Sequence, residues 1–256
     1  MTAKNLYFTG TAGCGKSTLT NAFQVWLSRQ GIDAITVNLD PGVDSVPYTP
    51  DVDIRDWIKL SEIMAEHGLG PNGAQIVAAD MLALNIKEVS TVIDGFDPDY
   101  VLIDTPGQLE LFAFRQSSRH MVEELGIEQS ALAFLYDPAI CRSANGYVSS
   151  LLLSATIQFR FPIPMINMVG KSDMLSEEDR ERMELWGKDY YALFNAVLDE
   201  AADAQSQVNA EFLQAMETVG VGRGAFYVSS ETNDGFEDLY SAVQMAFEGG
   251  EDVDLG

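Results

Sequence analysis

The stretch Gly10-Thr11-Ala12-Gly13-Cys14-Gly15-Lys16-Ser17 decides the fold of this chain. It matches the pattern of a phosphate-binding loop, in which a glycine-rich turn ends in Lys-Ser or Lys-Thr. The apolar run 6–9 directly before it predicts a strand, and the residues from Ser17 onward predict a helix. Because strand, loop and helix follow in the order that the pattern requires, the sequence predicts a P-loop nucleoside triphosphatase.

The residue types of this loop indicate its chemistry. Glycines allow the backbone to aim successive N–H groups inward around a β-phosphate, and the helix N-terminus adds its dipole. Lys16 is expected to contact the β- and γ-phosphates, and the Ser17 hydroxyl to bind Mg²⁺. The predicted nucleotide-binding residues of this segment are Gly10, Thr11, Ala12, Gly13, Cys14, Gly15, Lys16, Ser17 and Thr18.

Short apolar runs alternate with helical patterns along the rest of the chain. This alternation is typical of a parallel sheet covered by helices, and uninterrupted apolar runs are typical of strands buried on both faces. We therefore expect an α/β fold over residues 1–256, a single three-layer P-loop NTPase domain with a mainly parallel central sheet flanked by helices. The expected strands are 6–9, 34–39, 100–103, 132–136, 165–169 and 225–228.

Two segments depart from this alternation. About sixty residues separate the second expected strand from the third, which is too many for one crossover. Residues 54–67 and 74–92 have helical spacing around a Gly-rich loop at 68–73, so we expect a helical insertion at about 54–92 that does not serve the sheet. Residues 176–217 predict covering helices that begin at a capping-box-like Ser176 and Asp179.

The segment Asp104-Thr105-Pro106-Gly107-Gln108 directly follows the expected strand 100–103. A carboxylate at the end of a strand beside the phosphate loop can hold Mg²⁺, usually through water. Gly107 can donate its backbone N–H to a γ-phosphate, which would let the segment sense hydrolysis. The sequence therefore predicts a metal ligand at Asp104 and a nucleotide contact at Gly107.

A second carboxylate, Asp40, ends the expected strand 34–39 in the segment Asn38-Leu39-Asp40-Pro41-Gly42. It is placed to face the γ-phosphate and to position or deprotonate an attacking water. Ser17, Asp40 and Asp104 are the predicted metal ligands, since a shared cation offsets the repulsion between the two carboxylates. A turn begun by Asp-Pro is the alternative interpretation of Asp40.

Recognition of the base is expected late in the chain. Gly170-Lys171-Ser172-Asp173 follows the expected strand 165–169. Asp173 can accept hydrogen bonds from the ring N–H and amino group of guanine, a pattern that adenine lacks, while the Lys171 stem packs on the base. Ser229 and Ser230, after the last expected strand, can offer backbone N–H groups to the guanine carbonyl. These residues predict GTP and GDP as the nucleotides.

The composition narrows the remaining choices. The 15 Lys and Arg and 39 Asp and Glu give a net charge of −24, so direct nucleic-acid binding is not expected, because such surfaces need clustered basic residues. An acidic shell of this size favours a halophilic protein over one that merely resists misassociation. With no signal-peptide pattern, no membrane-spanning apolar run and only two cysteines, we expect a cytoplasmic protein without membrane association or disulfides.

Together these motifs resemble the GPN-loop GTPases, in the class of dimeric P-loop proteins that also holds the signal-recognition-particle GTPases. The phosphate loop, Asp40-Pro41, the segment 104–108 and Ser229-Ser230 fall in the family's order and spacing, and the resemblance covers nearly the whole chain. The identifying tripeptide Gly70-Pro71-Asn72 lies in the insertion that the sheet does not require. The chain is similar to a single archaeal-type member.

The resemblance implies a homodimer in which each insertion reaches the nucleotide of the partner. Asn72 would then contact phosphate across the interface, and Asp40 and Gln108 would surround the attacking water, with Glu110 nearby. The implied catalytic residues are Lys16, Asp40, Asn72 and Gln108. A protein client, in assembly of a larger complex, is a further implication of the family.

Two residues depart from the family pattern. The guanine-reading loop should read Asn-Lys-x-Asp, but Gly170 stands where the asparagine belongs, so no side-chain amide is available there for guanine N7. Asn167, earlier on the same strand, is a candidate substitute. Gly42 replaces the usual alanine after Asp40-Pro41, a change expected to loosen the switch.

Two other functions use the same phosphate loop. A P-loop ATPase or small-molecule kinase is disfavoured because only fifteen basic residues are present and no Arg-rich lid for a second phosphorylated substrate is recognisable. A binding scaffold with bound nucleotide and negligible turnover is the second alternative. A dimeric, nucleotide-dependent GTP-hydrolysing switch is the function that the motifs favour.

Overall fold

The fold is built on a seven-stranded sheet in the order β3-β2-β4-β1-β5-β6-β7, in which every adjacent pair is parallel. The computed structural model describes residues 3–200, 204–219 and 224–248. This sheet confirms the expected α/β P-loop fold. The strands are β1 (Lys4–Gly10), β2 (Ala34–Asn38), β3 (Val52–Asp53), β4 (Tyr100–Asp104), β5 (Ser130–Tyr136), β6 (Met165–Val169) and β7 (Phe226–Tyr227).

The two edge strands differ from the expectation. β3 was not expected, because two residues are too short to show an apolar pattern; it pairs with β2 at Val37 and Val52. β7 is shorter than the expected 225–228, although the Val228 N–H still donates to the Val169 carbonyl. The four central strands are buried along nearly their whole length, which explains why their apolar runs are uninterrupted.

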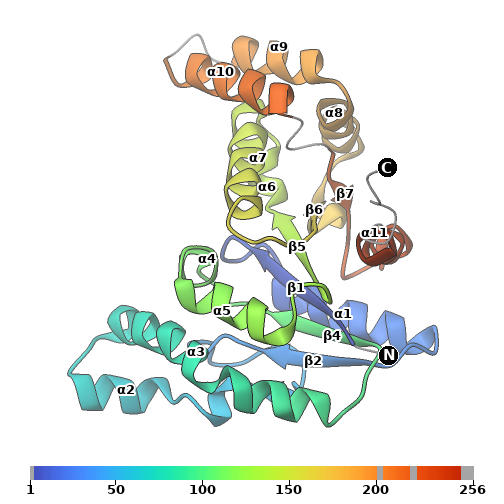
Figure 1. The fold of residues 1–256 in the computed structure, drawn as a ribbon. Helices are drawn as coiled ribbons and strands as arrows, with labels where there is room; N and C mark the ends of the chain where they lie inside the picture. The colour runs from blue at the N-terminus through green and yellow to red at the C-terminus, as the bar shows by residue number, and fades with distance from the viewer. Residues whose placement is uncertain (1–2, 201–203, 220–223, 249–256) are drawn as a thin grey trace, which may run out of the picture.

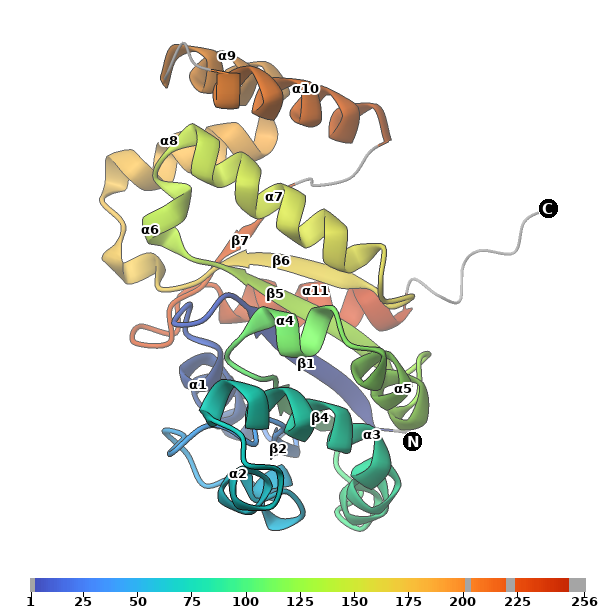
Figure 2. The same ribbon diagram turned by 90° about the vertical axis from the view of Figure 1, so that its left-hand side faces the viewer.

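Helices cover both faces of the sheet (Figures 1 and 2). On one face α1 (Lys16–Arg29) and α11 (Phe236–Glu248) pack through Phe23, Leu27 and Leu239. The other face carries the larger core, formed mainly by α3, α5 and α7. The remaining elements of that half have these bounds: α4 (Leu109–Ala113), α5 (Gln116–Leu125), α6 (Pro138–Cys141) and α7 (Ala144–Gln158).

The insertion after β3 begins with a 3-10 turn, η1 (Ile54–Asp56), followed by α2 (Leu60–His67) and α3 (Pro71–Asp94). Its second helix was expected from residue 74 but begins at Pro71. Proline has its φ fixed near the helical value and lacks the N–H that the first turn leaves unpaired, so it starts a helix well. The tripeptide expected as a loop tip is therefore the N-cap and first two residues of a 24-residue helix.

The covering helices lie at the opposite end of the molecule from α2 and α3 (Figures 1 and 2). They are α8 (Glu177–Lys188), α9 (Tyr190–Glu200) and α10 (Ala204–Val219), preceded by the 3-10 turn η2 (Ser172–Met174). Ser176 caps α8 by accepting the Asp179 N–H at 3.1 Å, as the sequence predicts. No helix among the described residues is long and apolar enough to cross a membrane.

Candidate nucleotide site

The predicted motifs meet at the carboxyl ends of the central strands. Asp104 ends β4, which lies between β1 and β2, and the phosphate loop leaves the adjacent end of β1. Two cavities open there and share Gly15, Thr18 and Lys171 in their walls. The two cavities are therefore neighbours.

The phosphate loop has the backbone that its glycines predict. Gly13 and Gly15 adopt φ of 79° and 105°, in the left-handed region that residues with a Cβ rarely enter. The Cys14 N–H donates to the Thr11 carbonyl at 3.2 Å, which closes the turn. Burial raises the pKa of the Cys14 thiol despite the nearby Lys16, so this cysteine is a packing residue in its protonated form.

Lys16 is held beneath this loop. Its side chain is 5% exposed, and Nζ donates to the carbonyls of Gly10 at 3.1 Å, Thr11 at 3.0 Å and Gly107 at 3.4 Å. The ammonium group thus joins the phosphate loop to the segment after β4. It lies at the wall of a cavity of about 300 Å³, which we call the phosphate cavity. The other residues of that wall are Gly13, Gly15, Ser17, Thr18, Asp40, Val43, Val46, Asp104, Thr105, Gly107 and Lys171.

Asp40 connects two loops through its carboxylate. Oδ1 accepts the Gly42 N–H and Oδ2 accepts the Gly107 N–H, both at 2.8 Å. The Asp40 N–H in turn donates to Asn38 Oδ1 at 3.1 Å. The amide that the sequence assigned to a γ-phosphate is therefore bonded to Asp40 in this structure, so a phosphate and Asp40 would compete for it.

Asp104 is almost fully buried, with 2% of its surface exposed. Tyr48 donates its hydroxyl to Oδ2 at 3.1 Å, whereas Oδ1 is buried without a hydrogen-bond partner among the described residues. Burial raises the pKa of this carboxyl to about 6, against hydrogen bonds from Ser17 and Tyr48 that favour its charged form. An unpartnered buried carboxylate oxygen next to a serine hydroxyl is a donor set that fits Mg²⁺.

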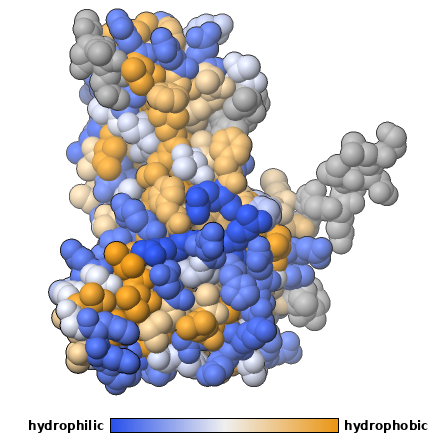
Figure 3. All heavy atoms as spheres, turned by 60° about the vertical axis from the view of Figure 1, so that its left-hand side comes forward, coloured by the Kyte–Doolittle hydropathy of each residue, from blue (hydrophilic) through white to orange (hydrophobic). Residues whose placement is uncertain are grey.

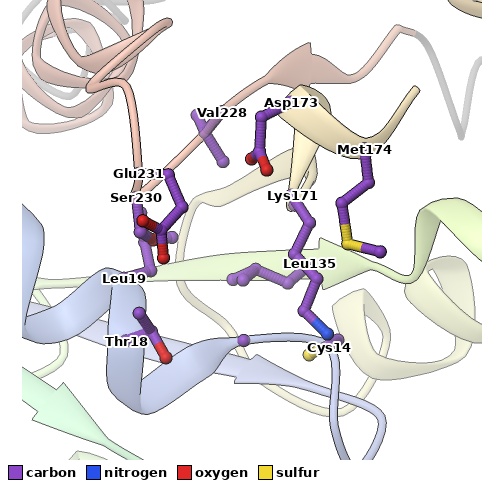
Figure 4. A pocket seen from close by; sticks show the side chains of 12 residues that line it. Cys14, Thr18, Leu19, Leu135, Lys171, Asp173, Met174, Val228, Ser230 and Glu231 are labelled. Carbon is purple, nitrogen blue, oxygen red and sulfur yellow. The ribbon is translucent and has the colours of Figure 1, made fainter. Parts of the chain in front are cut away.

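The second cavity, of about 200 Å³, is lined by residues of the phosphate loop, α1 and β5 and by the segments that follow β6 and β7, and we call it the base cavity. Figure 4 shows Lys171 and Asp173 on one wall, with Ser230 and Glu231 facing them. Lys171 has φ of 51°, and its Nζ donates to the Gly13 carbonyl at 2.6 Å. The base cavity is thereby tied to the phosphate loop through the Lys171 side chain.

Asp173 is positioned from behind by Ser229. The Ser229 hydroxyl donates to Asp173 Oδ1 at 2.5 Å and accepts the N–H groups of Glu231 and Thr232 at 3.2 Å each. Ser230 lines the base cavity, but Ser229 does not. Of the two serines predicted to contact the base, one is therefore placed to orient the carboxylate.

Gln108, Asn72 and Asn167, which the sequence singled out, are among the residues that line neither cavity. Gln108 is exposed at the N-cap of α4, and Asn72 is exposed in the first turn of α3. Asn167 lies within β6, lines neither cavity, and has a buried Oδ1 without a hydrogen-bond partner among the described residues. The structure therefore gives no support to Asn167 as the substitute for the missing amide.

Comparisons with known proteins address the family directly. The sequence profile of a family described as "Conserved hypothetical ATP binding protein" matches residues 8–249. The chain is 35% identical over 235 residues to the GPN-loop GTPase PAB0955 of Pyrococcus abyssi, an alignment that covers 91% of this chain and 92% of that protein. This chain belongs to the GPN-loop GTPase family.

A solved structure and a eukaryotic relative agree with this assignment. The crystal structure of the Pyrococcus abyssi GTPase PAB0955 in its apo form has a TM-score of 0.86 to this chain at 33% identity, covering 96% of this chain and 98% of that one. GPN-loop GTPase 1 of Saccharomyces cerevisiae is 28% identical over 263 residues, 95% of this chain and 66% of that protein. The predictions of the family and of a P-loop GTPase are confirmed.

In this GPN-loop GTPase, the side chains of Arg55, Tyr48 and Gln75 contact the residues around the phosphate cavity, and sequence reasoning did not single them out. Arg55 donates from Nη1 to the carbonyls of Val43 and Asp44, both at 3.2 Å, and so holds the loop that follows Asp40. Its ion pair with Asp53, 2.6 Å long, belongs to a group of hydrogen bonds that lowers the pKa of that carboxyl although burial opposes it. Tyr48 is the second residue, through its bond to Asp104. Neither lies in a motif, so no local pattern could have found it.

The third residue is Gln75, in the first turns of α3. A Cβ on Gly42 would lie 2.7 Å from Gln75 Nε2 and 3.1 Å from its Cδ. Gln75 therefore occupies the space that an alanine side chain would need at position 42. Gly42 therefore lies against the helix that carries Gly70-Pro71-Asn72 at its start, and the expected loosening of its loop stays a prediction.

Proposed function

We propose that this GPN-loop GTPase binds GTP with Mg²⁺ and hydrolyses it to GDP and phosphate. The observation that carries the proposal is the pair of adjacent cavities, one walled by the phosphate loop with Asp40 and Asp104, the other by Lys171 and Asp173. The description of the family profile names ATP as the nucleotide, whereas the relatives are named GTPases. Asp173 favours guanine, because a carboxylate accepts from the ring N–H and amino group that guanine presents together and adenine does not.

Each group of the phosphate cavity has a task in this proposal. Backbone N–H groups of the phosphate loop and Lys16 bind the phosphates and balance the charge that develops during transfer. Ser17, Asp104 and Asp40 would hold Mg²⁺, which when bound supplies positive charge to the β- and γ-phosphate oxygens. Asp40 orients the attacking water and accepts its proton, with Gln108 brought in when its loop closes.

The bond between Asp40 and Gly107 supports a switch. For the Gly107 N–H to reach a γ-phosphate, its 2.8 Å bond to Asp40 must open, which frees Oδ2 of Asp40 for water. Binding of GTP and release of the catalytic carboxylate would then be one event. After phosphate leaves, the bond can form again, so the loop position would report the nucleotide state.

A homodimer completes the proposal. Asn72 is exposed at the start of α3 and lines neither cavity of its own chain, so its implied phosphate contact is assigned to a second copy. On the same helix Ile76 is 43% exposed and Leu84 is 80% exposed, and a spacing of eight residues places them within one broad stripe. Figure 3 shows hydrophobic areas on both sides of a hydrophilic band on one face of the molecule, as expected for an interaction surface.

Phosphate release from GTP without any acceptor tests the proposal. We expect turnover that requires Mg²⁺ and is at least about tenfold faster with GTP than with ATP at equal subsaturating concentration. A requirement for a small-molecule acceptor would indicate a kinase, and tight binding without release would indicate a scaffold. Size-exclusion chromatography with a non-hydrolysable GTP analogue, for the wild type and Asn72→Ala, tests the dimer and the contribution of Asn72 to turnover.

The net charge of −24 supports a proposal about the surroundings of the protein. A cytoplasm of high salt would screen the repulsion among 39 acidic residues. We expect the melting temperature to rise with KCl concentration. Stability independent of KCl would contradict the halophilic proposal and leave the GTPase proposal untouched.

A protein client is a further part of the proposal. It would be sought as a partner that this chain retains only when the GTP analogue is bound.

A further inference from the structure

Gly170 lies where the phosphate loop and the base cavity meet. Its N–H donates to the Tyr136 carbonyl at 3.1 Å, and the residue is buried. A Cβ at this position would lie 2.9 Å from the carbonyl oxygen of Cys14 and 3.4 Å from Leu135 Cδ2. The first distance is too short for a Cβ, and its neighbour is backbone, which cannot turn aside as a flexible side chain can. The phosphate loop itself therefore occupies the space of a side chain at position 170.

Among the described residues, no side chain that lines the base cavity supplies an amide. The lining residues are Cys14, Gly15, Thr18, Leu19, Leu135, Gly170, Lys171, Asp173, Met174, Val228, Ser230 and Glu231. None of them is Asn, Gln, His or Arg, and the one amine, Lys171 Nζ, donates to the Gly13 carbonyl. The N–H groups of Cys14 and Gly170 are also used within the protein, by the Thr11 and Tyr136 carbonyls.

The two cavities fix which edge of a purine faces this end. Phosphates on the loop require the ribose, and with it the five-membered ring, to lie toward Cys14. The six-membered ring then points toward Asp173, on the wall away from the phosphate loop (Figure 4). N7 of the five-membered ring is a hydrogen-bond acceptor. The Cys14 carbonyl oxygen, which lies where a side chain of residue 170 would be, is also an acceptor. It therefore cannot form a hydrogen bond with N7.

We propose that this chain recognises guanine through Asp173 and is indifferent to N7, so that it accepts 7-deazaguanine nucleotides as it accepts GTP. The Ser229 hydroxyl fixes the Asp173 carboxylate, which leaves the discrimination against adenine on that one edge. The inference rests on the proposed function, because it specifies which guanine nucleotides the same site takes.

The test compares GTP, 7-deaza-GTP and ATP on the wild-type protein by isothermal titration. We expect the dissociation constants of GTP and 7-deaza-GTP to agree within about threefold. A site that bonds N7 would leave a buried donor unpaired with the deaza analogue and lose about fivefold or more. If the affinity for 7-deaza-GTP is more than threefold lower than that for GTP, the inference is wrong. The proposed function still stands in that case, provided that GTP binds. If GTP does not bind, or binds no better than ATP, both fall.

Two variants test the packing argument. Gly170→Asn and its control Gly170→Ala both add a Cβ against the Cys14 carbonyl, so both should weaken GTP binding to a similar extent. Neither should create a preference for GTP over 7-deaza-GTP. If Gly170→Asn binds GTP more tightly than the wild type and rejects the deaza analogue by more than threefold, room for the amide exists and the inference is wrong. Should the variants fail to fold in thermal melts, the wild-type comparison decides alone.

Discussion

The two ends of the nucleotide site are closed by different kinds of neighbour. At the phosphate end, the place of a Cβ on Gly42 is taken by the amide end of Gln75, a flexible side chain. At the base end, the corresponding place beside Gly170 is taken by the Cys14 carbonyl, which is backbone. A side chain at either position would meet a neighbour, yet only one of the two neighbours can turn away.

This difference indicates a division of labour. The phosphate end is held by hydrogen bonds that can exchange partners, such as those from Gly42 and Gly107 to Asp40. The base end is held by strand ends and by Lys171 bonded to Gly13. We therefore expect the phosphate end to rearrange with the nucleotide and the base end to keep its shape.

Asp40→Ala should have the largest effect, because it removes the proposed general base from the adjustable end. We expect single-turnover phosphate release to fall by about a hundredfold or more. The affinity for GTP without added metal should change by less than about threefold. Asp44→Ala is the matched control, an exposed acid in the same loop that lines neither cavity. Unchanged turnover in Asp40→Ala would remove this residue from the chemistry.

Asp173→Ala should have the next largest effect, on binding at the fixed end. Loss of two hydrogen bonds to a charged acceptor should lower GTP affinity by roughly a hundredfold, with ATP affinity nearly unchanged. Glu231→Ala, at the same cavity wall, serves as the control and should change GTP affinity by less than about threefold. Equal losses for GTP and ATP would show that Asp173 supports the fold without reading the base.

Asp104→Asn should stabilise the protein when nucleotide and metal are absent. The folded-state pKa of about 6 lies above the ordinary value of 3.8, so ionising this carboxyl in the fold costs stability as pH rises from 3.8 to 6. Above pH 6 the free energy of unfolding, measured with urea in the presence of EDTA, should be about 2 to 3 kcal/mol higher for the variant than for the wild type. The difference should shrink as pH falls through 6. A constant difference across that window would contradict the raised pKa.

The smallest effects come from the two glycines themselves. Gly170→Ala should cost about 1 to 3 kcal/mol of stability, because the new methyl meets backbone. Gly42→Ala should change stability by less than about 1 kcal/mol, since Gln75 can swing and the unfolded chain loses entropy. The double variant Gly42→Ala with Gln75→Ala removes the contact altogether. Equal costs at both positions would mean that the two ends are alike.

Much of this site could be predicted from the sequence because its motifs are local. The phosphate loop, Asp40 and Asp104 each lie at or just after the end of a strand, and a parallel sheet brings such strand ends together. Tyr48, Arg55 and Gln75 could not be predicted, because each acts through a contact set by folding and none lies in a pattern. β3 was missed for a related reason, since two residues carry no periodicity.

Gly170 is intermediate between the residues that could be predicted from the sequence and those that could not. The departure from the motif was visible in the sequence, but its physical cause was not. Only the fold brings the Cys14 carbonyl, more than 150 residues earlier in the chain, within 2.9 Å of the missing Cβ. The structure was also needed to exclude Asn167 from the cavity wall. This residue lies three places before Gly170 on β6, which is too far back along the strand to reach the cavity.

The helix α3 is in mechanical terms a cantilever. Its 24 residues make a rod roughly 36 Å long, fixed along its length by Ala78, Leu82 and Ile86 in the core. Ala74 is also buried in the core, so only the first turn of the helix, residues 71–73, lies beyond the fixed part. Gln75 and Asn72 lie within one turn of each other. A partner that contacts Asn72 and the loop that contacts Gln75 would therefore act on the same first turns of the helix. Neither effect has to be transmitted along the length of α3.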